Sequence, residues 1–83
     1  MGFIFGKYAL YVKFQDGSAG YLMGVQGDHA MVCNSPGNAE KFMSESGAID
    51  YARRNDLMYC SNSHCSRVKY VYIWSDGKIF RMG

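Results

Sequence analysis

The 83-residue sequence lacks the features of a membrane protein or a secreted protein. Its uncharged runs are far shorter than the roughly 18 apolar residues that a membrane span needs. Residues 1–8 lack the basic, apolar and small-residue zones of a signal peptide. There are three cysteines, whereas a secreted disulfide scaffold of this size usually carries an even number. We therefore expect a cytoplasmic protein with free thiols and no membrane contact.

The sequence also lacks the motifs of common catalytic sites. No glycine-rich G-x-x-x-x-G-K phosphate loop occurs in it. Its acidic residues fall mostly at expected turns or around one expected helix, where they have local roles. His64 precedes Cys65, but no third group is evident that would orient the histidine to activate a cysteine nucleophile. We therefore predict a non-enzymatic protein without a cofactor.

Aromatic and apolar residues, in contrast, are abundant. Apolar residues make up 48% of the chain and include seven Tyr and five Phe, which is too many for a disordered tail. The length predicts a single domain over residues 1–83. A core of this size is too small to enclose a large substrate cavity as well.

Two Asp-Gly dipeptides between β-rich runs predict two hairpins. The first hairpin joins residues 8–14 to residues 19–25. With a two-residue loop at Asp16-Gly17, Val12 pairs with Tyr21. The core face then carries Tyr8, Leu10, Val12, Phe14, Ala19, Tyr21, Met23 and Val25, and the lighter face carries Tyr11, Lys13, Gly20 and Gly24.

The second hairpin joins residues 67–74 to residues 79–82 through Asp76-Gly77, so that Ile73 opposes Phe80. One face carries Val71, Ile73, Phe80 and Met82, and the reverse face carries Tyr70, Tyr72, Trp74, Ile79 and Arg81. Only one of these faces can meet a single helix. The other must be exposed, meet the first hairpin or meet a partner.

One helix is expected between the hairpins. Ser44 is a favourable N-cap, Glu45 suits the first turn, and the basic pair Arg53-Arg54 suits the last turn before Asn55. The apolar run 30–33 predicts a third strand ahead of the helix. The resulting order predicts an α+β fold, in which an antiparallel sheet of about five strands carries one packed helix.

The best candidate for a metal site is a group of five histidine and cysteine residues: His29, Cys33, Cys60, His64 and Cys65. Structural zinc takes four such ligands in a tetrahedron. The spacing fits poorly, because two residues four apart on one strand lie about 13 Å apart. Zinc therefore requires His29 to lie in a loop, and the alternative is a buried Cys33 with surface histidines and loop thiols.

The most suggestive feature is the reverse face of the second hairpin. Aromatic side chains interleaved with cations can stack bases and hold phosphates, and they also anchor protein interfaces. Residues 1–52 have a net charge of −2 and residues 53–83 one of +4, an asymmetry that indicates either an anionic partner or ordinary surface charge. The candidate partner-binding residues are Arg67, Lys69, Tyr70, Tyr72, Trp74 and Arg81.

Two segments resemble small proteins of bacteria and phages. Residues 39–52 carry an A-x-K-F-x-S-x-x-x-A-x-x-Y-A pattern that is similar to one in many tiny sheet-plus-helix proteins. The hairpin over residues 68–80, with its Asp-Gly turn, is similar to those of small phage anti-CRISPR proteins. That resemblance implies a short protein without enzymatic motifs that blocks a nuclease or surveillance complex by binding it.

We therefore expect an inhibitor of the anti-CRISPR type, a monomer or homodimer that binds a protein or ribonucleoprotein complex stoichiometrically. A direct nucleic-acid-binding module and a small zinc-stabilised adaptor are the alternatives. The first alternative predicts a steep loss of affinity as salt rises. The second predicts stoichiometric zinc and a fold that depends on it.

Overall fold

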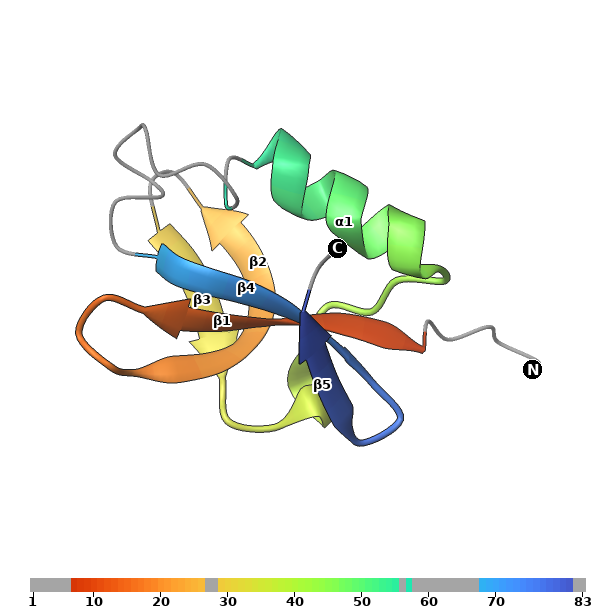
Figure 1. Cartoon of the computed structure of the whole chain (residues 1–83), viewed down its shortest axis with the longest axis horizontal. Helices are drawn as coiled ribbons and strands as arrows, with labels where there is room; N and C mark the ends of the chain where they lie inside the picture. Colours follow the sequence, from red (N-terminus) through yellow and green to blue (C-terminus); the bar gives the residue numbers. More distant parts are fainter. Residues whose placement is uncertain (1–6, 27–28, 56, 58–67, 82–83) are drawn as a thin grey trace.

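The structure, a computed structural model, describes residues 7–26, 29–55, 57 and 68–81. Its elements, in chain order, are strands β1 (Tyr8–Phe14), β2 (Ala19–Gln26) and β3 (His29–Cys33), the 3-10 helix η1 (Pro36–Asn38), the helix α1 (Glu45–Arg54), and strands β4 (Val68–Ser75) and β5 (Lys78–Arg81). The strands form one antiparallel sheet in the order β3-β2-β1-β4-β5 (Figure 1). The predicted α+β fold is therefore confirmed.

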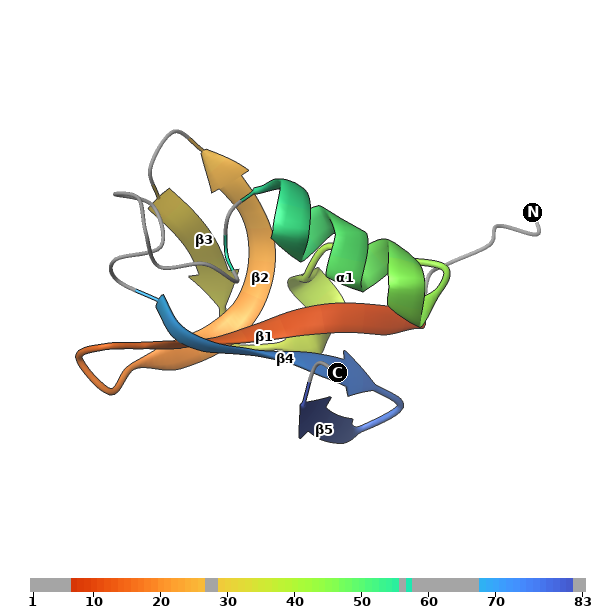
Figure 2. The same cartoon turned by 45° about the horizontal axis from the view of Figure 1, so that its top comes forward.

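Helix α1 begins and ends at the predicted residues. The Ser44 hydroxyl accepts a hydrogen bond from the Gly47 N–H at 3.0 Å, and so satisfies one of the unpaired N–H groups at the helix start. At the other end, the Asn55 side-chain amide donates to the Tyr51 carbonyl at 2.9 Å. The helix lies across β1 and β4 (Figure 2).

The core lies between α1 and the sheet. Ala48 and Ala52 are fully buried, and their small side chains let the helix approach the strands closely. The rest of the buried cluster consists of Leu10, Val12, Leu22, Leu57, Val68 and Ile73. A fully buried side chain of these apolar types stabilises a fold by roughly 1.5–3 kcal/mol. This burial fixes which side of β1 and β4 faces the helix.

The first hairpin has a different register from the predicted one. Its loop has three residues, because the Phe14 N–H donates to the Ser18 carbonyl at 2.8 Å and Tyr11, rather than Val12, opposes Tyr21. Gly17 has φ +93, as a three-residue loop with a left-handed last residue requires. The predicted pairing of Val12 with Tyr21 is therefore wrong by one residue.

This change of one residue turns β2 over, since successive side chains point to opposite faces of a sheet. Gly20 and Leu22 lie on the core side and are buried. Tyr21 and Met23, which the two-residue loop assigned to the core, lie on the other side. The predicted core face is therefore correct for β1 and wrong for the β2 residues Ala19, Tyr21 and Met23.

The second hairpin agrees with the prediction. Asp76 and Gly77 form a two-residue loop with φ +52 and +80, the positive values of a type I′ turn. Ile73 opposes Phe80, as expected. The predicted partnership of Val71 with Met82 lies outside the described residues.

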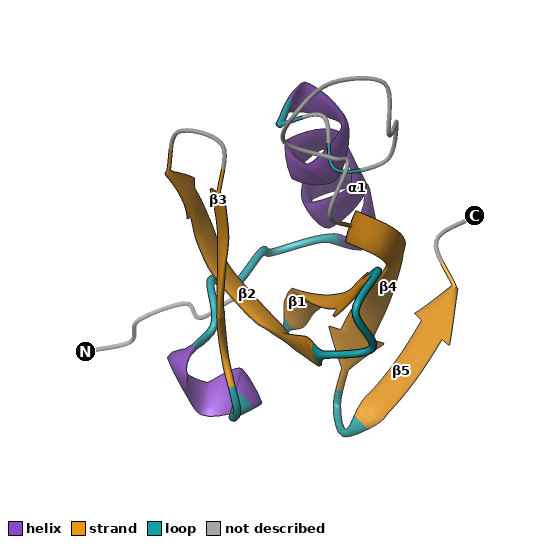
Figure 3. Cartoon of the chain, turned by 90° about the vertical axis from the view of Figure 1, so that its left-hand side faces the viewer, coloured by secondary structure: helices purple, strands orange, loops and turns teal. Residues whose placement is uncertain are grey.

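Strand β2 bends away from β1 along its length (Figure 3). The pairing with β3 shifts by one residue between Leu22 and Gly24, and such a bulge bends the strand that carries it. A side chain at Gly24 would come within 4.0 Å of the Tyr51 hydroxyl on α1. Beyond the point where β2 separates from β1, the connector after η1 pairs with both strands. The Glu40 N–H donates to the Leu22 carbonyl on β2, and Phe42 pairs with Tyr8 on β1.

Candidate binding surface

Five aromatic side chains share the side of the sheet that faces away from α1. They are Tyr11 on β1, Tyr21 on β2, and Tyr70, Tyr72 and Trp74 on β4, and we call them the aromatic face. On β4 they alternate with Val71 and Ile73, which pack in the helix-side core. The same alternation on β1 places Tyr11 on the other side of the sheet from the buried Leu10 and Val12.

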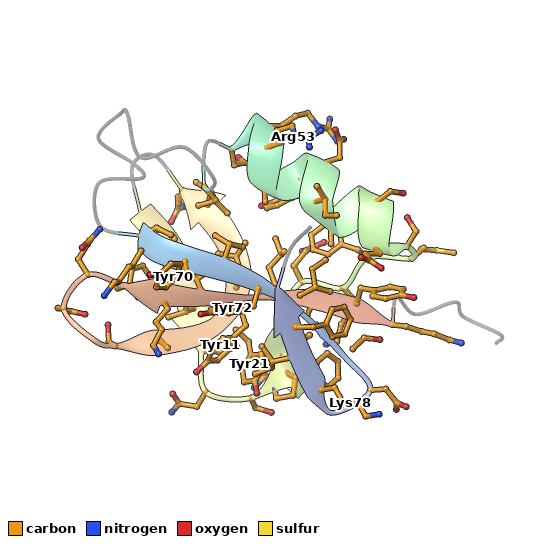
Figure 4. All side chains as sticks on the ribbon, in the orientation of Figure 1. Tyr11, Tyr21, Arg53, Tyr70, Tyr72 and Lys78 are labelled. Atoms are coloured by element: carbon orange, nitrogen blue, oxygen red, sulfur yellow. The ribbon has the colours of Figure 1, made fainter. Side chains whose placement is uncertain are left out.

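Each ring of the aromatic face touches its neighbour. The centroids of Tyr70 and Tyr72 are 6.2 Å apart, those of Tyr72 and Tyr11 are 6.2 Å apart, and those of Tyr11 and Tyr21 are 5.0 Å apart. Trp74 joins at the Tyr21 end, at 6.3 Å. The four tyrosines follow one another across β4, β1 and β2 (Figure 4). Centroid distances of 4.5–7 Å are typical of favourable aromatic pairs, so these contacts stabilise the arrangement of the rings.

The surface is most open at the Tyr70 end. Tyr70 is 47% exposed, whereas Tyr11, Tyr21, Tyr72 and Trp74 are half-buried. Ile79, the partner of Trp74 on β5, lies on the same side and is 43% exposed. Exposed apolar and aromatic side chains gathered on one side of a sheet are typical of a contact surface.

The charge of the strands has one sign. The five strands contain Lys13, Lys69, Lys78 and Arg81, and no Asp or Glu. Lys13 is the strand partner of Tyr70, and the Lys69 ammonium lies 5.6 Å from the centre of the Tyr70 ring. Two cations therefore flank the most exposed ring of the aromatic face, which favours an anionic partner.

Most of the predicted binding residues lie where the sequence placed them. Tyr70, Tyr72 and Trp74 share one side of β4, and Arg81 opposes Tyr72 in the backbone pairing. These aromatics do not lie under α1, because Val71 and Ile73 on the other side of β4 pack in the helix-side core. Lys69 is exposed and lies near the aromatic residues, over the Tyr70 ring, and Arg67 lies outside the described residues.

Sequence reasoning missed Tyr11 and Tyr21. A two-residue loop predicts Tyr11 on the lighter face of the first hairpin, outside the candidate site, and Tyr21 on the core face. The observed loop of three residues places Gly20 rather than Tyr21 opposite Val12. That arrangement gathers every tyrosine of β1, β2 and β4 except Tyr8 on one side.

The candidate zinc ligands do not come together in the described part of the chain. His29 and Cys33 are the first and last residues of β3, so that strand geometry separates them by about 13 Å. The Cys33 thiol instead approaches the Ser35 carbonyl at 3.1 Å and the Tyr21 carbonyl at 3.5 Å. Within the described ranges no three His, Cys, Asp or Glu residues are grouped as metal ligands would be. Cys60, His64 and Cys65 lie outside these ranges.

No family model, curated protein or solved structure matches the chain. In the described ranges, no helix has both the length and the apolar character needed to span a membrane.

Proposed function

We propose that the chain is a non-enzymatic binding protein that contacts its partner through the aromatic face. The observation that carries this proposal is the continuous row of rings on the side of the sheet away from α1, ending at the exposed Tyr70. Tyr and Trp are enriched among residues that dominate binding energy. Rings that already hold one another in place lose less entropy when a partner binds.

A stoichiometric inhibitor of a host nuclease or surveillance complex is one form of this proposal. It is the class implied by the resemblance to small anti-CRISPR proteins, and it requires a surface but no chemistry. The strand charges constrain its target. Because Lys13 and Lys69 flank Tyr70, the contacted surface should be acidic or should carry nucleic acid, since a basic groove would be repelled.

Direct binding of nucleic acid is the second candidate. The specific observation in its favour is that all the Lys, Arg, Asp and Glu positions within the five strands are occupied by Lys or Arg, with no acidic residue. Cationic side chains interleaved with aromatic rings are the combination that single-strand binders use.

A capture experiment tests the proposed surface. Immobilised parent protein and the variants Tyr70→Ala and Met43→Ala are exposed to host lysate, and retained molecules are quantified by mass spectrometry. Met43 is a matched control, because it is 67% exposed and lies next to α1. We expect Tyr70→Ala to lose the partner while it melts like the parent, and Met43→Ala to keep it. Equal retention by both variants would contradict the proposal.

A further inference from the structure

We propose that the aromatic face binds single-stranded nucleic acid, with bases stacked on the tyrosine row and phosphates held by Lys13 and Lys69. This inference deepens the proposed function and rests on it for the location of the contact surface. Three features carry it: the spacing of the rings, the position of the two lysines, and the absence of acidic residues from the strands.

The spacing of the rings favours an extended, single-stranded nucleic acid over a duplex. Neighbouring centroids from Tyr70 through Tyr72 and Tyr11 to Tyr21 are 5.0 to 6.2 Å apart. Successive nucleotides of a B-form strand rise about 3.4 Å with parallel bases, whereas these neighbouring rings are tilted by 56° to 62° to one another, so bases on neighbouring rings must be unstacked from each other. A duplex keeps its bases stacked on one another and hidden from the rings. Stacking on aromatic rings tolerates any sequence, because every base has a π-face.

The two lysines lie where a backbone would pass. Lys13 and Tyr70 are strand partners, so their side chains emerge side by side on the same face. The Lys69 ammonium lies 5.6 Å from the centre of the Tyr70 ring. A base that stacks on Tyr70 in place of the Lys69 ammonium would leave this cation, and Lys13 on the neighbouring strand, to bind the phosphate of the same nucleotide.

The same charges argue against a second copy of the chain as the occupant. Two aromatic faces brought together by a two-fold axis would place Lys13 and Lys69 of both copies in one interface. No carboxylate in the strands could neutralise them. Like charges held together cost binding energy, whereas phosphates supply the missing anions.

Fluorescence anisotropy with labelled oligothymidylate and oligouridylate of about 12 nucleotides tests the inference. This length lies inside the roughly 4–16-nucleotide site size of single-strand-binding OB-folds. The variants are Tyr70→Ala, Tyr70→Phe and Lys13→Ala. Arg53→Ala is a matched charge control, because Arg53 is exposed on α1 (Figure 4). A thermal melt of each variant checks the fold. Comparing the two oligonucleotides distinguishes DNA from RNA as the natural source.

We expect Tyr70→Ala to weaken binding about 5- to 150-fold, and Tyr70→Phe, which keeps the ring, to restore it. Lys13→Ala should reduce the slope of log affinity against log salt by about 0.7, the contribution of one single-strand phosphate. Arg53→Ala should change neither quantity. A duplex of equal length should bind more weakly than either strand.

Three results would overturn the inference. The first is no binding of either oligonucleotide at low salt. The second is binding that Tyr70→Ala leaves unchanged, because charge alone would then account for it. The third is a protein retained from lysate by the parent, lost by Tyr70→Ala and not displaced by oligonucleotide. In that last case the proposed function stands and only the ligand assigned here is wrong.

Discussion

At the scale of single residues, the two Asp-Gly dipeptides form different turns. Asp76 adopts φ +52 and Gly77 +80, whereas at the first turn only Gly17 has a positive φ. The difference has a local cause: the Asp16 carboxylate accepts hydrogen bonds from the Ser18 N–H at 2.9 Å and the Ser18 hydroxyl at 2.6 Å. These bonds hold Asp16 in a three-residue loop.

Replacing the loop glycine should therefore destabilise the protein through the backbone alone. An added Cβ at Gly17 would meet nothing within 4 Å, so no steric clash contributes. We expect Gly17→Ala to lower the free energy of unfolding by about 1–2 kcal/mol, the cost of a left-handed conformation for a residue with a side chain. Urea unfolding measures it.

The matched control is Gly37→Ala. An added Cβ there would lie 3.6 Å from the Ser35 hydroxyl, and Gly37 has no positive φ. The free energy of unfolding of Gly37→Ala should equal that of the parent or rise slightly, because alanine restricts the unfolded chain. Equal losses at Gly17 and Gly37 would contradict the assigned turn.

At the scale of elements, sequence patterns predicted the helix and the second hairpin because local chemistry determines both. Ser44 caps the start of the helix and Asn55 caps its end, each through a side-chain hydrogen bond to nearby backbone. The Asp76-Gly77 turn fixes the register of the second hairpin. The first hairpin could not be fixed in this way. Its loop length depends on one bond pattern at Ser18, and an error of one residue reverses the faces of β2.

The candidate site was predicted in part for the same reason. Tyr70, Tyr72 and Trp74 follow from alternation within one strand, which needs no knowledge of neighbours. Tyr11 and Tyr21 join them only through the pairing of β1 with β4 and with β2. The order of strands in a sheet is a tertiary property, and no motif within this sequence specifies it.

The corrected register of β2 can be tested at Gly20. An added Cβ there would lie 2.8 Å from Cβ and Cγ2 of Val32 and 3.0 Å from the Cys33 carbonyl. We expect Gly20→Ala to lower the free energy of unfolding by about 1–3 kcal/mol, as overpacking does. Gly24→Ala is the control on the same strand, where the nearest atom is 4.0 Å away. If Gly20→Ala is as stable as the parent, Gly20 does not face β3 in this way.

At the scale of the whole molecule, the two sides of the sheet differ in composition. Helix α1 covers one side with Ala48 and Ala52, and the fully buried Leu10 and Ile73 pack there. The other side carries the aromatic face, whose strands bear cations and no carboxylates. This division leaves the aromatic face outside the helix-side core, as the proposed function requires.

The most direct test of this account is amide chemical-shift mapping of the isotope-labelled protein during titration with oligothymidylate. The account predicts that shifts concentrate at Lys13, Tyr70 and Tyr72, and at Tyr11 beside them, while α1 from Glu45 to Arg54 stays unchanged. Shifts confined to α1, or no shifts along β1 and β4 at saturating oligonucleotide, would contradict it.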